Sequence, residues 1–187
     1  MRAKRTPAPT AARSPKPSVE LVSGSVEEMQ AFGERLGRAL RAGDVVALRG
    51  MLGRGKTTLI QGIARGAGHG SQTLKSPTFV LMREYRGGMP LIHIDGYRLE
   101  GASAAAWLDL DQLFSRTKIT LIEWAERFEG LFPEDHLEVE LAHVSANRRR
   151  IAVKGTGPRS AATADTLRLA LSNETPAEST GEEAGEG

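Results

Sequence analysis

The segment from Gly50 to Thr57 restricts the possible folds of this chain more than any other. It reads Gly-Met-Leu-Gly-Arg-Gly-Lys-Thr and matches the pattern G-x-x-x-x-G-K-[ST], whose glycines let consecutive backbone N–H groups curl around a phosphate chain. The β-branched run at residues 45–48 precedes it and predicts a strand buried on both faces. Apolar residues at helical spacing follow over residues 56–67. A strand, a glycine loop and a helix in this order predict an α/β domain with a phosphate-binding loop.

The residues of this loop have separate predicted tasks. The N-terminus of the following helix offers unpaired N–H groups and the positive end of the helix dipole to a phosphate. Lys56 adds a point charge for the β and γ phosphates, and the Thr57 hydroxyl can coordinate Mg²⁺. The predicted nucleotide-binding residues of the loop are Leu52, Gly53, Arg54, Gly55, Lys56, Thr57 and Thr58.

Two carboxylates end predicted strands and are candidates for a magnesium site. Asp95 follows the apolar residues 91–94, and Glu123 follows residues 119–122. A phosphate loop needs an acid at the end of a neighbouring strand, because Mg²⁺ keeps several waters and takes few protein ligands. Either acid could hold the metal while the other orients or deprotonates the attacking water. The competing interpretation for each is a structural acid that caps a helix or pairs with an arginine.

The remaining patterns predict one folded domain over residues 18–155. A capping-box signature at Ser25 and Glu28 starts a helix with an apolar stripe that reaches Leu40. Further elements follow from their apolar patterns: a hairpin of residues 78–85 and 91–94, a helix over residues 102–114, a central strand at 119–122, and a strand pair at 137–141 and 151–153. The expected fold class is therefore α/β, a single P-loop NTPase domain with a mixed, mostly parallel central sheet flanked by helices.

The two ends of the chain carry opposite charge and few large apolar residues. Residues 1–17 are basic and residues 156–187 end in an acidic stretch, so we predict disordered tails at both ends, with a short helix at residues 160–171 if a partner binds there. The basic tail could make a weak contact with RNA. The chain has no cysteine and no apolar run of membrane-spanning length, which favours a cytoplasmic protein.

Three other functional classes share some of these features. A small-molecule or nucleoside kinase also has a phosphate loop, and Arg83, Arg86 and Arg98 could supply charge, but no helical lid is apparent. A GTP-dependent switch needs an Asn-Lys-x-Asp motif, and no asparagine is followed by lysine, so ATP is the better fit. A nucleic-acid-binding module would use residues 148–150, but no aromatic residues stand among these cations. His93 fits a hydrogen-bonded core histidine better than a ligand of a zinc site, because no second histidine stands at ligand spacing.

Four segments together resemble the TsaE family, the bacterial ATPase component of transfer-RNA threonylcarbamoyladenosine biosynthesis. They are GMLGRGKTT at residues 50–58, SPTF at 76–79, HIDGYRL at 93–99 and IEWAERF at 122–128. The resemblance implies ATP and Mg²⁺ as cofactors and slow ATP hydrolysis by the chain alone. It also implies two partners, a threonylcarbamoyl transferase subunit and its paralogous partner subunit. ATP turnover would reset their complex, which installs threonylcarbamoyl on adenosine next to the anticodon.

The resemblance further implies catalytic and metal-binding residues. Thr57 and Glu123 would hold Mg²⁺, with Lys56 on the phosphates. Asp95 would be needed for hydrolysis. Thr78 would sense the γ phosphate from a switch-like loop.

Two implied nucleotide contacts lie outside the phosphate loop, and two loop positions depart from the family pattern. Met29 would pack against the adenine, and Arg148 would lie near the nucleotide. Met51 stands where the family usually has aspartate, so a polar role for that position is in doubt. Arg54 stands where it usually has alanine, and its side chain would reach either phosphate oxygens or solvent.

Overall fold

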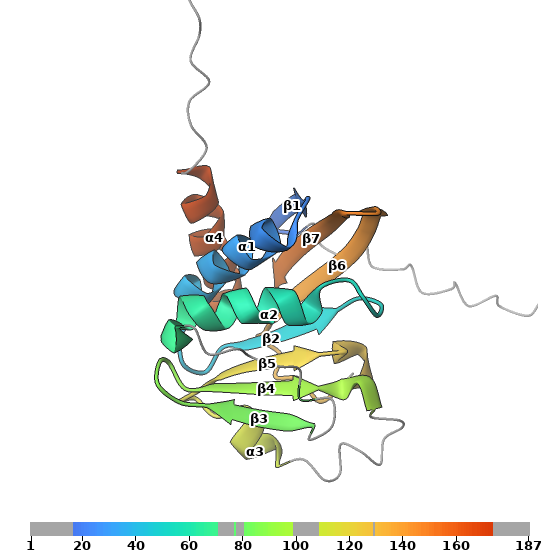
Figure 1. Ribbon diagram of the computed structural model, residues 1–187. Coiled ribbons are helices and arrows are strands. Elements are labelled where there is room, and N and C mark those ends of the chain that lie inside the picture. Colours follow the sequence, from blue (N-terminus) through green and yellow to red (C-terminus); the bar gives the residue numbers. More distant parts are fainter. Residues whose placement is uncertain (1–16, 71–76, 78–80, 99–108, 129, 174–187) are drawn as a thin grey trace, which may run out of the picture.

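The structure, a computed structural model, describes residues 17–70, 77, 81–98, 109–128 and 130–173. In this part of the chain all strands belong to one sheet flanked by helices (Figure 1). The strands are β1 (Val19–Ser23), β2 (Val45–Arg49), β3 (Met82–Tyr85), β4 (Leu91–Asp95), β5 (Ile119–Glu123), β6 (Leu137–Ser145) and β7 (Arg148–Gly155). The helices are α1 (Val26–Ala39), α2 (Lys56–Ala64), α3 (Leu110–Leu113) and α4 (Pro158–Ser172), with a π-helical turn η1 (Arg65–His69) and 3₁₀ turns η2 (Gly96–Arg98) and η4 (Ala125–Phe128).

The seven strands lie in the order β1-β7-β6-β2-β5-β4-β3. Strands β6, β2, β5 and β4 form a parallel centre, and β1 runs in the same direction. Strands β7 and β3 run the other way. The expected mixed, mostly parallel sheet is therefore confirmed. Because parallel strands end at the same edge, the carboxyl ends of β2, β5 and β4 lie beside one another, where open α/β sheets bind ligands.

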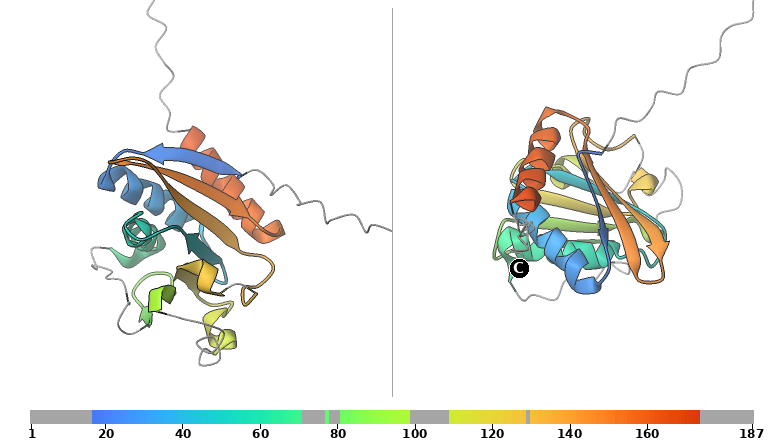
Figure 2. Two further views of the ribbon diagram at one scale, coloured as in Figure 1. Left: turned by 90° about the vertical axis from the view of Figure 1, so that its right-hand side faces the viewer. Right: turned by 90° about the horizontal axis from the view of Figure 1, so that it is seen from above.

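Helices cover both faces of the sheet. Helices α1, α2 and α4 lie on one face, and α3 and η4 lie on the other (Figures 1 and 2). Successive residues of β2 divide between two apolar clusters. Val46 and Leu48 belong to the cluster under α1 and α2, whereas Val45 belongs to the cluster that contains Phe128. The strand is thus buried on both faces, as its apolar run predicted.

Helix α1 begins where the capping-box signature placed it. Ser25 Oγ accepts a hydrogen bond from the backbone N–H of Glu28 at 3.0 Å, and the Glu28 carboxylate accepts one from Gly24 at 2.6 Å. Further along, α1 lies so close to α2 that a Cβ on Gly33 would be 2.5 Å from the carbonyl oxygen of Leu59. This close packing holds the first half of α1 beside the start of α2, where the phosphate loop ends.

The prediction of a disordered tail over residues 156–187 is wrong for the part that forms α4. This helix buries Ala164 and Leu167 completely in the main apolar cluster. The Asp135 carboxylate accepts hydrogen bonds from two backbone N–H groups in the first turn of α4, at 2.8 Å each. A helix was predicted at residues 160–171 only if a partner binds there. Its place in the folded domain escaped prediction because only a narrow stripe of it is buried and because its capping acid comes from a distant loop. The folded domain therefore includes α4.

The variant Leu167→Ala tests whether α4 belongs to the folded domain. Because Leu167 is fully buried, the truncation leaves a cavity, and we expect the free energy of unfolding to fall by about 2–5 kcal/mol. Leu169 lies on the same helix and is 55% exposed, so Leu169→Ala should change that free energy by no more than about 0.5 kcal/mol. Urea denaturation measures both. Equal transition midpoints for the two variants would show that α4 adds nothing to the core.

Other predicted elements agree with the structure in whole or in part. The hairpin of β3 with β4 and the pair of β6 with β7 are both present. Of the helix predicted over residues 102–114, the structure shows α3, while residues 99–108 lie outside the described part. The same holds for residues 1–16 and 174–187 of the predicted tails. None of the described helices combines the length and the apolar character needed to cross a membrane.

Candidate nucleotide-binding site

The phosphate loop connects the carboxyl end of β2 to the first turn of α2. Gly50, Gly53 and Gly55 have φ angles of +141°, +75° and +95°, which residues with a Cβ rarely adopt. A Cβ on Gly50 would also lie 2.6 Å from the carbonyl oxygen of Leu141 on β6. No described side chain caps the N-terminus of α2. The loop therefore has the curled backbone that its glycines predicted, and the helix dipole there favours an anion.

Lys56 is a buried cation within this loop. The residue is 5% exposed, and its Nζ donates hydrogen bonds to the carbonyl oxygens of Gly50 and Met51. The same Nζ lies 3.8 Å from the centroid of the Trp124 ring. Burial lowers the pKa of Lys56, and nearby carboxylates, Glu123 first, oppose that shift. Because the carbonyls and the ring carry no net charge, a phosphate would be a stronger partner for Lys56 than they are.

Thr57 and Glu123 meet at the base of the loop. Thr57 Oγ1 lies 3.0 Å from Oε1 and 3.1 Å from Oε2 of Glu123, and Glu123 is 3% exposed. A hydroxyl and a carboxylate beside a phosphate loop form the donor set that suits Mg²⁺, which takes its remaining ligands from phosphate oxygens and water. Within the described ranges there is no cluster of three or more His, Asp or Glu side chains for a metal, and a magnesium site of this kind needs none.

Asp95 lies next to this pair, at the end of the adjacent strand. It pairs in register with Glu123 across β4 and β5 and is 4% exposed. Its Oδ1 accepts a hydrogen bond from the backbone N–H of Tyr97 at 2.9 Å. The two acids that the strand patterns alone left equivalent thus differ in position: Glu123 contacts Thr57, as the family resemblance implied. Asp95 lines the same cavity as Lys56, Thr57 and Glu123.

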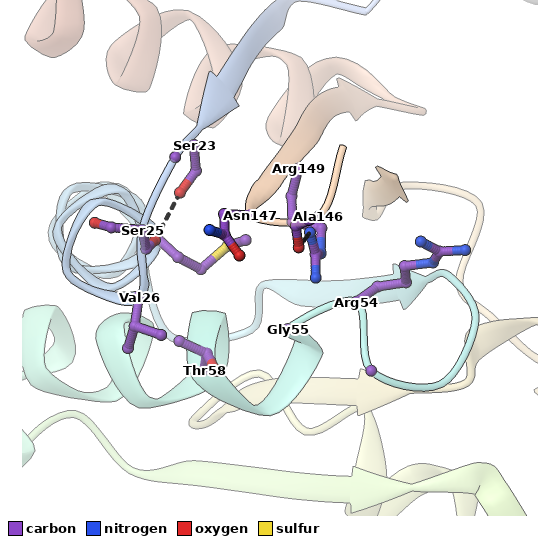
Figure 3. Close-up of a pocket in the computed structure, with 12 residues that line it drawn as sticks. Ser23, Ser25, Val26, Arg54, Gly55, Thr58, Ala146, Asn147 and Arg149 are labelled. Carbon is purple, nitrogen blue, oxygen red and sulfur yellow. Dashed lines mark hydrogen bonds between the residues drawn. The ribbon is translucent and has the colours of Figure 1, made fainter. Parts of the chain in front are cut away.

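Two cavities adjoin along the loop. The first has a volume of about 480 Å³ and is lined by Leu52, Gly53, Arg54, Gly55, Lys56, Thr57, Thr58, Asp95, Tyr97, Glu123 and Trp124. The second, of about 430 Å³, lies between the loop, the start of α1 and the turn from β6 to β7 (Figure 3). Gly53, Arg54, Gly55 and Thr58 line both. Cavities of this size could hold a nucleotide, with its phosphates in the first and its nucleoside in the second. The first is called the phosphate cavity below.

The second cavity has an apolar side and a polar side. Met29 and Val26 come from α1, Asn147 comes from the turn between β6 and β7, and Arg149 comes from the start of β7. In Figure 3 Asn147 faces the start of α1, while the Arg54 side chain extends away from this helix. A flat base could pack on the thioether of Met29 and present its edge to the amide of Asn147.

Most of the predicted site residues line these cavities, with two exceptions. Residues 52–58 line the phosphate cavity, and Met29 lines the second cavity, as expected. Arg148 does not line either one. Arg149 lines the second cavity instead. Its Nη1 donates hydrogen bonds to three backbone carbonyls in and beside the turn. Thr78 lies outside the described residues, so the structure does not test its predicted role.

Trp124 has a position that the sequence did not indicate. Its φ angle is +58°, a left-handed conformation that costs a non-glycine residue roughly 1–2 kcal/mol. In this conformation its ring lies over Lys56 and 5.1 Å from the ring of Tyr97. Trp124 therefore packs against Lys56 rather than in either apolar cluster. Met51 and Leu52, at the tip of the loop, are 69% and 71% exposed.

Comparisons with known proteins show which family this chain resembles. Residues 23–151 match the family described as threonylcarbamoyl adenosine biosynthesis protein TsaE. The tRNA threonylcarbamoyladenosine biosynthesis protein TsaE of Streptomyces coelicolor is 41% identical over 151 residues, which cover 76% of this chain and 99% of that protein. The protein of the same name from Bacillus subtilis is 36% identical over 134 residues, which cover 71% of this chain and 83% of that protein.

A solved structure has the same fold. The crystal structure of YdiB from Bacillus subtilis superposes with a TM-score of 0.70 and 28% sequence identity, covering 82% of this chain and 95% of that chain. The matched residues 23–151 include the phosphate loop, Asp95 and Glu123. On the extent of these matches, the chain belongs to the TsaE family of threonylcarbamoyl adenosine biosynthesis proteins.

Proposed function

We propose that this protein binds ATP with Mg²⁺ and hydrolyses it to ADP and phosphate, as a component of the bacterial complex that installs threonylcarbamoyl on adenosine next to the anticodon of transfer RNA. The observation that carries the ATPase proposal is the contact between Thr57 and Glu123 at 3.0 Å beside a phosphate-binding loop. The names of the relatives from Streptomyces coelicolor and Bacillus subtilis support the pathway. This function places the protein in the cytoplasm, together with transfer RNA.

In the proposed complex, ATP lies across the two adjoining cavities. The N–H groups of the loop and of the first turn of α2 bind the phosphates. Lys56 turns its Nζ from the Gly50 and Met51 carbonyls toward the β and γ phosphates. Thr57 and Glu123 would hold Mg²⁺, which would supply positive charge beside the phosphate oxygens. Met29 packs on the base.

For hydrolysis, the proposal assigns the attacking water to Asp95. A carboxylate next to the phosphate cavity can orient the water and accept its proton. Thr78 is the proposed hydroxyl that contacts the γ phosphate. Turnover by the chain alone should be slow, because Lys56 and Arg54 are the cations that line the phosphate cavity among the described residues, and phosphoryl transfer gains speed from additional charge-stabilising groups.

The partners proposed for this protein are the transferase subunit of the pathway and its paralogous partner subunit. The proposal assigns ATP turnover to this chain and the threonylcarbamoyl transfer to the transferase subunit. We therefore propose that ATP turnover by this chain resets the transferase complex, and that any contact with transfer RNA is weak or passes through these partners.

Deletion of the gene tests the proposed pathway. We expect threonylcarbamoyladenosine to fall sharply in transfer-RNA hydrolysates analysed by mass spectrometry, because the transferase complex would no longer be reset. The unaltered gene and the variant Lys118→Ala, outside the nucleotide site, should both restore the modified nucleoside, and Lys56→Ala should not. Normal modification in the deletion strain would refute the assignment to this pathway.

A further inference from the structure

His93 lies directly behind the proposed magnesium site. It occupies the middle of β4, is completely buried, and places its Nε2 at 2.9 Å from Oε1 of Glu123. Its other ring nitrogen, Nδ1, is buried without a hydrogen-bond partner among the described residues. The proposed function gives His93 no task, although it is the one histidine that touches a proposed metal ligand.

The chemistry of the two groups fixes the direction of this hydrogen bond. An ionised carboxylate only accepts hydrogen bonds, so Nε2 carries a hydrogen and donates it to Glu123. A buried polar nitrogen without a partner, such as Nδ1, costs about 1–3 kcal/mol. An apolar side chain would fill the same place in β4 without this cost. The free energy that offsets this cost must therefore come from the hydrogen bond between His93 and Glu123.

That bond controls where the carboxylate of Glu123 can point. Oε1 is within hydrogen-bonding distance of both His93 and Thr57, whereas Oε2 faces Thr57 at 3.1 Å. A metal ion that binds Thr57 Oγ1 and a glutamate oxygen would remove the bond between the two side chains. Of these two partners, only His93 would then still hold Glu123. Partners of this kind, which hold a metal ligand from behind, typically contribute about 10–100-fold in metal affinity.

We propose that His93 is a positioning residue for the metal, one that keeps the Glu123 carboxylate turned toward Thr57 and the phosphate loop. This inference rests on the proposed function, because it concerns the metal that accompanies ATP. His93 touches neither nucleotide nor metal. Its removal should therefore weaken metal binding while leaving metal-free nucleotide binding unchanged.

Two amide substitutions of similar polarity test the proposal. The side-chain nitrogen of glutamine reaches about as far as Nε2 of histidine, whereas that of asparagine reaches only as far as Nδ1. We expect His93→Asn to weaken the affinity of the protein–ATP complex for Mn²⁺, measured by electron paramagnetic resonance, by about 10–100-fold. His93→Gln should remain within about threefold of the unaltered protein. Binding of ATP in the presence of EDTA should be the same for all three proteins.

His69 provides the matched control. It is also buried, its Nε2 contacts the carbonyl oxygen of Met89 at 2.8 Å, and its Nδ1 likewise has no partner among the described residues. His69→Asn should lower thermal stability and leave the Mn²⁺ affinity unchanged. Equal Mn²⁺ affinity for His93→Asn and the unaltered protein, or an equal loss in His69→Asn, would overturn the positioning role. If the unaltered protein binds no ATP, the proposed function itself fails and the inference falls with it.

Discussion

Lys56→Ala should abolish measurable ATP binding. In the proposed complex Lys56 donates charge-assisted hydrogen bonds to two phosphates, and each such bond is worth about 1.5–3 kcal/mol. Their loss corresponds to a fall in affinity of roughly 10²–10⁴-fold. The domain itself should stay folded, since burial already lowers the pKa of Lys56 and so disfavours its charged form. Isothermal titration calorimetry with ATP and Mg²⁺ measures the effect.

Lys118→Ala is the control for this experiment. Lys118 precedes β5 at the edge of the sheet opposite Glu123, and its Nζ pairs with Glu84 at 3.1 Å. Removal of this pair should cost no more than about 1 kcal/mol of stability and leave ATP affinity unchanged. ATP binding by Lys56→Ala with the affinity of the unaltered protein would mean that the phosphates do not lie in this loop.

Asp95→Ala should separate binding from turnover. Thr57 is hydrogen-bonded to Glu123, and Asp95 accepts a hydrogen bond from the backbone of Tyr97, so removal of Asp95 should change ATP affinity by less than about threefold, a free-energy difference below about 0.7 kcal/mol. Loss of a group that orients or deprotonates the attacking water should slow hydrolysis by about 10²–10⁴-fold. Calorimetry gives the affinity, and phosphate release under saturating ATP gives the rate.

Asp95→Asn distinguishes the chemical role of Asp95 from its structural one. The amide oxygen of asparagine can still accept the hydrogen bond from the Tyr97 N–H, but the amide cannot take a proton from water. This variant should therefore be folded like the unaltered protein and as slow as Asp95→Ala. Asp111→Ala, an exposed acid on α3, should leave the rate unchanged. Full hydrolysis by either Asp95 variant would remove Asp95 from the mechanism.

Local patterns were sufficient to predict the parts of the site that lie on consecutive residues. The glycines between 50 and 55 determine the loop, since their positive φ angles depend on the residue type itself. The strands that end in Asp95 and Glu123 were predictable from short apolar runs followed by an acid. Helix α1 was predictable from its cap and its apolar stripe. Each of these signals acts over a few residues.

The contacts that local sequence patterns did not reveal all depend on long-range pairing. Asn147 and Arg149 reach the second cavity only because β6 pairs with β2, which brings a distant turn over the loop. Selection of Glu123 over Asp95 as the partner of Thr57 depends on the strand order, in which β5 rather than β4 lies next to β2. Helix α4 depends on a cap supplied by Asp135. None of these pairings leaves a periodic signal in the chain.

Titration of the unaltered protein with ATP, with Mg²⁺ and then with EDTA, is the most direct test of the central claim that the loop at residues 50–57 and Glu123 together hold a metal–nucleotide complex. The proposal predicts saturable binding of ATP that is tighter with Mg²⁺ than with EDTA, and weaker binding of GTP under both conditions. No binding of ATP with Mg²⁺ present, or binding that is indifferent to the metal, would contradict it.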